Sequence, residues 1–201
     1  MDAEQRVALL EQGIAAARQI SPYYDDVLRE VSARIGASGS VGKGDIAMLA
    51  FWKRIPTSSW DVRILSLPEA RVREVTASAV ADIAAAKRSD LIAAAQHARE
   101  LLRELPGFKL GSAMASAVLT AIRPDGLAVY DSNANVGLEV VELGLARDAA
   151  NHYSEYMRRI GQCRAEASAV RGHQWSAHEV DLALYELGKM QPGASTDQQE
   201  R

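Results

Sequence analysis

The residues with the clearest chemical potential lie in the segment 105–131. It reads Leu-Pro-Gly-Phe-Lys-Leu-Gly-Ser, followed by an alanine-rich run and then Val-Tyr-Asp. Pro106 and Gly107 predict the end of one helix, because proline lacks an amide donor and glycine readily takes the left-handed conformation. Gly111 and Ser112 predict the start of the next helix, whose first amides would point at an anion such as a phosphate.

A carboxylate follows this predicted hairpin. Asp131 comes twenty residues after Gly111, at the start of another predicted helix. Near a sugar C1′, a carboxylate can stabilise developing positive charge and orient or activate water, and a helix N-terminus favours its ionised form. Aspartate is also a preferred helix N-cap, so Asp131 could serve only as a cap. The two roles are compatible.

This arrangement resembles the helix-hairpin-helix DNA glycosylase superfamily, with its endonuclease III / 8-oxoguanine glycosylase-like fold. The shared pattern is Leu-Pro-Gly-hydrophobic-Gly, an alanine-rich helix, and Val-Asp at a helix start. Three further segments resemble a divergent branch without an iron–sulfur cluster: Asp45–Arg54, Tyr153–Met157 and Glu179–Lys189. The resemblance implies an all-α, two-lobed fold, with a DNA cleft between the lobes and Asp131 at its floor. It also implies hydrolytic removal of a damaged, mismatched or modified base, in repair or in defence against modified phage DNA.

The resemblance also implies that the hairpin binds a DNA phosphate through its backbone amides, and that its backbone carbonyls could bind a monovalent cation. Three residues separate the two glycines where relatives usually have one, so Phe108 and Leu110 could instead be core residues. The hairpin residues expected to bind DNA are Gly107, Lys109, Gly111 and Ser112.

Relatives that also cut the strand carry a lysine two residues beyond the second glycine, where it forms a Schiff base with the sugar. Ala113 occupies the position two residues beyond Gly111. If Gly107 is instead aligned with the relatives' first glycine, their shorter spacing places Gly111 where they have the lysine. Lys109 is close by but is better suited to a phosphate contact. The sequence therefore favours a glycosylase that leaves the strand intact.

A flipped base needs an aromatic or apolar slot and polar groups for its edge. Tyr130 has the best positional argument because it precedes Asp131, whereas Trp52 lies in an apolar run and could be core. Lys53 could approach from another helix. The remaining candidates are Trp60 and Trp175 for stacking, and Asn133 and Asn135 for hydrogen bonding.

Composition favours close-packed helices, since 48% of the 201 residues are hydrophobic but only 5% are aromatic, and alanine dominates many windows. We expect one domain over 1–190 and a disordered polar tail over 191–201. Ser176 and Glu179 form a predicted capping box, and Ser21-Pro22 predicts a helix start. Val62–Leu67 is the one mild strand candidate. The other predicted helices begin with one around residues 7–17 and continue over 45–53, 68–87, 89–104, 112–122, 132–143, 147–160 and 176–189.

The overall charge argues against a nucleic-acid partner, since the net charge is -3 and nucleic-acid binders are usually basic. Basic residues nevertheless gather over 53–73 and 147–171, although solvated helix faces produce such clusters too. A single cysteine rules out an internal disulfide, a zinc knuckle and a four-cysteine iron–sulfur cluster, and the four histidines lack metal-ligand spacing. We expect no metal or organic cofactor.

Neither a signal peptide nor a stretch of the ~20 apolar residues that a bilayer requires is evident in the sequence. We therefore expect a cytoplasmic monomer with DNA as its partner and no membrane association. Two alternatives remain: a DNA-binding module that has the fold without the chemistry, and a small helical interaction protein. The lengthened hairpin, the missing lysine and the acidic charge favour the first of these.

Overall fold

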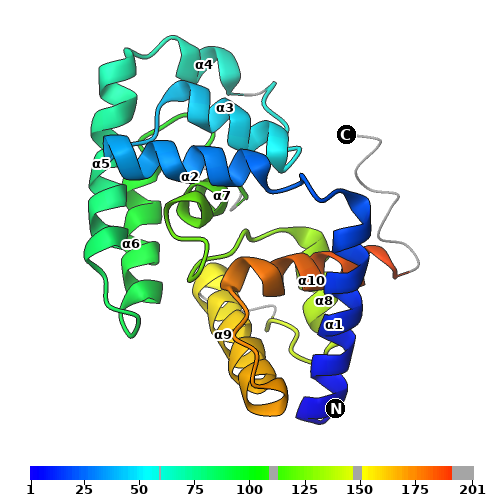
Figure 1. Ribbon diagram of the computed structural model, residues 1–201. Helices are drawn as coiled ribbons and strands as arrows, with labels where there is room; N and C mark the ends of the chain where they lie inside the picture. Colours follow the sequence, from blue (N-terminus) through cyan, green and yellow to red (C-terminus); the bar gives the residue numbers. More distant parts are fainter. Residues whose placement is uncertain (59, 109–112, 147–150, 192–201) are drawn as a thin grey trace. The chain divides into compact units, whose positions relative to one another are not determined.

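The computed structural model describes residues 1–58, 60–108, 113–146 and 151–191 (Figure 1). Within these ranges there are ten α-helices and no strand, which confirms the prediction of an all-α protein. The chain divides into two compact units. The central unit is Tyr23–Val129, and the end unit joins Met1–Pro22 to the chain from Tyr130 onward.

The central unit is built around one helix, α7 (Ala113–Ile122), in which every residue over 114–121 is buried. Small side chains on α7 let four other helices of the unit, α2, α3, α5 and α6, pack against it, and α5 lies beside α6 (Figure 1). This unit also contains α4. Its other helices are α2 (Asp26–Ser38), α3 (Lys43–Trp52), α4 (Asp61–Leu65), α5 (Glu69–Ala85) and α6 (Leu91–Leu102).

The end unit contains α1 (Ala3–Ile20), α8 (Ser132–Val140), α9 (His152–Arg171) and α10 (Ala177–Lys189). Helix α10 is its centre and packs against the other three (Figure 1). The backbones of α1 and α10 touch at Gly13, where a Cβ atom would lie 2.3 Å from the carbonyl oxygen of Ala183. Glycine is required at such a crossing because any side chain would force the helices apart.

A buried arginine joins three parts of the end unit. Arg6 on α1 donates from Nε to the carbonyl oxygen of Val141 at 2.9 Å and from Nη1 to Glu166 on α9 at 2.6 Å. Because both acceptors lie far from Arg6 in the sequence, the side chain fixes α1 against the end of α8 and against α9. A hydrogen-bonded charge of this kind is costly to leave without its partner.

Most predicted helices are present, and the Ser176–Glu179 capping box is confirmed by hydrogen bonds in both directions. The mild strand candidate over 62–67 is wrong, because α4 occupies its first four residues and the described chain forms no strand there. Val62 and Leu65 are exposed there and only Ile64 is buried, so the apolar residues do not form one buried strand face.

Several helix boundaries differ from prediction by a few residues, and two of the differences have a clear physical reason. Helix α2 begins at Asp26 rather than after Ser21-Pro22, since the chain first makes a turn in which the Asp26 amide donates to the Tyr23 carbonyl at 3.1 Å. Helix α9 continues past 160 to Arg171, because Cys163 and Ala167 extend its buried stripe at helical spacing.

Among the helices described, none combines the length and apolar character needed to cross a membrane.

Candidate functional site

Asp131 is the N-cap of α8. Its backbone is extended, with φ -137° and ψ 168°, and its Oδ1 accepts a hydrogen bond from the Ala134 amide at 2.9 Å. The predicted capping role is therefore confirmed. The side chain is half-buried, so a carboxylate held at a helix N-terminus stays within reach of solvent.

Helix α8 is held on α10 by glycines on both helices. A Cβ atom at Gly137 on α8 would lie 2.0 Å from the carbonyl oxygen of Leu184, and one at Gly188 on α10 would lie 1.9 Å from that of Asn133. The two backbones touch without intervening side chains, at points two and six residues beyond Asp131. This contact fixes the start of α8, and with it the position of the Asp131 carboxylate.

A buried tyrosine close to Asp131 is hydrogen-bonded to a buried aspartate. The Tyr156 hydroxyl on α9 donates to Oδ1 of Asp181 on α10 at 2.6 Å, and both residues are 0% exposed. Burial raises the pKa of Tyr156 well above its usual value, with further contributions from Asp181 and, more weakly, from the charge of Asp131. The phenol therefore stays protonated as a hydrogen-bond donor.

Tyr130 joins this cluster through its ring. The Tyr130 and Tyr156 rings meet edge to face, with centroids 5.3 Å apart and planes at 82°. Tyr130 is half-buried and directly precedes Asp131. A residue that stacks on a flipped base needs such a partly exposed ring. The cluster formed by Tyr130, Asp131, Tyr156 and Asp181 is called the carboxylate cluster below.

The two asparagines predicted for base contacts lie on α8 beside this cluster. Asn133 is buried at 6% exposure, under the α8–α10 crossing. Asn135 is half-buried, and its Oδ1 is shielded from solvent and accepts no hydrogen bond from the described residues. Both asparagines therefore lie within the packing around α8 rather than in an open binding slot.

The other predicted pocket residues belong to the central unit. Trp52 is 5% exposed, as expected of a core residue, and its ring lies 6.1 Å from that of Tyr24. Lys53 places its Nζ 4.5 Å from the centre of the Trp52 ring, a cation–π distance. Phe51, the residue before them, is 80% exposed.

The predicted hairpin is described up to Phe108. Gly107 has a φ of +89°, and a Cβ atom there would lie 2.5 Å from Cδ2 of Trp60, so both conformation and space require glycine. Trp60 is buried and donates from Nε1 to the Pro56 carbonyl at 3.0 Å, which makes it a support for the hairpin. Phe108 is a core residue at 3% exposure, which confirms that alternative. Three predicted phosphate-binding residues, and with them most of the hairpin where a cation was expected, lie outside the described residues: Lys109, Gly111 and Ser112.

Many arginines in the two basic segments are paired with carboxylates. The pairs are Arg71 with Glu74 and Glu104, Arg73 with Glu69, Arg158 and Arg159 with Glu155, and Arg171 with Glu11. Surface pairs of this kind typically contribute only about 0.2–1 kcal/mol, so a phosphate could replace a carboxylate at small cost.

The remaining stacking candidate, Trp175, is buried at 6% exposure, and its carbonyl oxygen accepts a hydrogen bond from Arg164.

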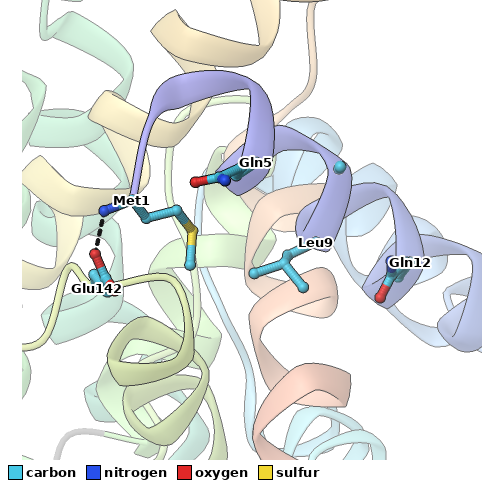
Figure 2. Close-up of a pocket in the computed structure, with 6 residues that line it drawn as sticks. Met1, Gln5, Leu9, Gln12 and Glu142 are labelled. Atoms are coloured by element: carbon cyan, nitrogen blue, oxygen red, sulfur yellow. Dashed lines mark hydrogen bonds and ion pairs between the residues drawn. The ribbon is translucent and has the colours of Figure 1, made fainter.

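Two further features of the described chain bear on ligand binding. In the ranges with described coordinates, no three histidine, cysteine, aspartate or glutamate side chains are grouped where they could hold a metal ion. A shallow hollow of about 560 Å³ on the end unit is lined by α1 and by Glu142, whose carboxylate pairs with the Met1 amino group (Figure 2). Asp131 is not among its lining residues.

Sequence reasoning named the segments that contain Tyr156 and Asp181 but gave neither residue a role. One signal was available, since Asp181 shares helical spacing with the buried residues Ala177, Leu184 and Gly188. A carboxylate on the buried stripe of a helix predicts a specific buried partner. The identity of that partner depends on a neighbouring helix and could not be read from spacing.

Comparison of the chain with protein-family models, with curated proteins and with solved structures finds no match. Function is therefore inferred from the residues and their geometry.

Proposed function

We propose that the protein is a DNA N-glycosylase of the helix-hairpin-helix type, which hydrolyses the N-glycosidic bond of a damaged or modified base. The catalytic group is the carboxylate of Asp131. The observation that carries this proposal is the position of Asp131. Its carboxylate is half-buried at the N-terminus of α8, the backbone of α8 contacts that of α10, and Tyr130 lies beside it.

This setting suits the chemistry of glycosidic hydrolysis. As the bond between base and sugar breaks, positive charge develops at C1′, and a carboxylate fixed nearby stabilises it. The same carboxylate can orient a water molecule, whose oxygen bonds to C1′ while a proton is transferred to the departing base. The reaction consumes only water and needs no organic cofactor. The Ala134 amide and the N-terminus of α8 face Asp131 and complement a negative charge there.

The proposed product is a free base and an intact strand with an abasic site. A Schiff-base mechanism needs an amine in the hairpin–helix segment, and the two possible positions hold Ala113 and Gly111. Lys109 is the only lysine in this segment, and we assign it a phosphate contact instead.

The arrangement of the resembling segments supports the proposed glycosylase-like fold. Tyr153–Met157 and Glu179–Lys189 belong to the same compact unit as Asp131, and a hydrogen bond joins their buried members Tyr156 and Asp181. The Leu-Pro-Gly turn belongs to the central unit, and the chain passes from that unit to the end unit at Tyr130, directly before Asp131. Two compact units are what a two-lobed fold requires.

The second candidate function is DNA binding without base removal. It is favoured by the three residues that separate Gly107 from Gly111, where glycosylases of this type usually have one. Both candidates bind DNA in a salt-sensitive way, so binding alone does not separate them. The products do.

The test is mass spectrometry of bases released by purified protein from several DNAs, including heavily modified phage DNA, together with a count of abasic sites. We expect one class of free base and an equal number of abasic sites in uncut strands. Borohydride should trap no covalent protein–DNA adduct. Binding without release from any of these DNAs would favour the second candidate, and no salt-sensitive binding at all would favour a protein-interaction role.

A further inference from the structure

We infer that Tyr156 and Asp181 form a buried pair that positions the Asp131 carboxylate for base removal. The inference rests on the proposed function and adds two residues to it. It is drawn from two contacts, the 2.6 Å hydrogen bond between the two side chains and the 5.3 Å edge-to-face contact of Tyr156 with Tyr130. Tyr130 in turn directly precedes Asp131 in the sequence.

Packing alone does not explain this pair. Asp181 is 0% exposed on a helix whose neighbouring buried residues, Val180, Ala183 and Leu184, are apolar. Burying a carboxylate carries a desolvation cost, and replacing a buried polar pair by apolar groups of similar shape is often neutral or stabilising. A leucine and a phenylalanine would fill the same space, so a role in the adjacent site accounts for the pair better than stability does.

The contacts show how such a role would work. A phenol has one proton to donate, and that of Tyr156 goes to Asp181, which fixes the rotation of the hydroxyl and holds the ring between α9 and α10. The Tyr156 ring then supports Tyr130 from the protein interior. Tyr130 and Asp131 form the extended segment that enters α8, so a fixed Tyr130 limits the movement of Asp131.

The direction of the hydrogen bond also matters for the chemistry. Because the Tyr156 hydroxyl donates its proton to Asp181, it does not donate to Asp131, although the Asp131 carboxylate acts on its pKa. The Tyr156 hydroxyl therefore does not compete with the sugar cation for the Asp131 carboxylate. Without Asp181, the hydroxyl would be able to turn toward another acceptor.

The experiment measures single-turnover base release, DNA affinity and melting temperature in three variants and one control variant of the full-length protein. Tyr156→Phe removes only the hydroxyl, and Asp181→Leu removes the carboxylate that accepts its hydrogen bond. We expect each to lower the rate of base release roughly 10- to 100-fold, as misplaced catalytic groups do, with DNA affinity changed less than about two-fold. Tyr185→Phe, elsewhere on α10, is the matched control and should release base at the wild-type rate.

The third variant, Tyr156→Phe with Asp181→Leu, separates positioning from stability and remains informative where a single variant folds poorly. It removes both members of the pair together, so its melting temperature should recover toward the wild-type value while base release stays low. Wild-type rates in the folded double variant would overturn the inference and leave the proposed function intact. Rates that rise and fall with melting temperature across all variants would also overturn it, since the pair would then be merely structural. A wild-type protein that releases no base from any DNA overturns both.

Discussion

Asp131 combines a structural and a proposed chemical role in one side chain. Its Oδ1 caps α8 through the Ala134 amide, and this hydrogen bond also fixes the direction in which the carboxylate points. Helix caps are local features, so the sequence around Asp131 sufficed to predict this role. Tyr156 could not be predicted in the same way, because its partner Asp181 is 25 residues away and on another helix.

Cys163 provides a prediction for the pH dependence of stability. Burial in α9 raises the pKa of this thiol from 9.0 to about 12. The unfolded chain thus loses the proton near pH 9 while the folded protein keeps it, so the free energy of unfolding decreases as pH rises from 9 towards 12. By pH 10 this loss amounts to roughly 1.4 kcal/mol.

Urea unfolding at pH 8 and pH 10 tests this, with Cys163→Ala as the comparison. The variant should lose about 1.4 kcal/mol less stability than the wild type between the two pH values, because lysines and tyrosines titrate equally in both proteins. Equal losses in the two proteins would show that the thiol titrates normally in the folded state.

At the scale of helices, the crossing of α8 and α10 determines where the carboxylate cluster is assembled. Gly188→Ala would place a Cβ atom 1.9 Å from the Asn133 carbonyl oxygen, and neither backbone can move without disturbing its helix. Because overpacking costs about 1–3 kcal/mol, we expect a loss of at least this size in the free energy of unfolding. Base release should fall too, since the start of α8 must shift.

Gly161→Ala on α9 is the matched control. A Cβ atom at Gly161 meets nothing within 4 Å, and the residue lies inside a helix. The same substitution should therefore stabilise the protein by roughly 0.5–1 kcal/mol, because alanine favours the helix more than glycine. Chemical denaturation of both variants measures the contrast. A Gly188→Ala protein as stable as the wild type would mean that the helices are not in backbone contact.

Local patterns predicted helices well where the ends carry specific chemistry. The Ser176–Glu179 capping box begins α10 as expected, and Gly107 has the expected left-handed conformation, although α6 already ends at Leu102. Prediction was wrong where burial depends on distant elements. The sequence predicts a helix that ends at 160, yet the buried stripe of α9 continues through residues 161–171 although they are rich in polar groups.

For the whole molecule, the resemblance implied two lobes, but the bounds of the two compact units were not evident from the sequence. The end unit is assembled from both ends of the chain, because Gly13 on α1 meets Ala183 on α10. Contacts between residues so far apart leave little trace in local periodicity. Composition predicted only the all-α class.

DNA binding by the hairpin leads to a prediction about charge. Lys109→Glu should weaken binding to unrelated DNA sequences alike and lower the slope of log affinity against log salt by about one, since a phosphate contact is lost. Lys87→Glu is the control: it makes the same change of charge at an exposed turn of the central unit. Salt titrations of both variants give the comparison. Equal weakening would mean that Lys109 acts only through the overall charge.

The central claim is that Asp131 catalyses base removal, and the most direct test is single-turnover base release by Asp131→Asn. Asparagine caps a helix about as well as aspartate, so the melting temperature and DNA affinity should change little. Loss of the negative charge should slow base release at least ~10²- to 10³-fold, and loss of water activation should slow it further. Asp125→Asn, at an exposed position six residues earlier, should behave like the wild type. Base release at the wild-type rate by well-folded Asp131→Asn would contradict the account and leave Asp131 as a helix cap alone.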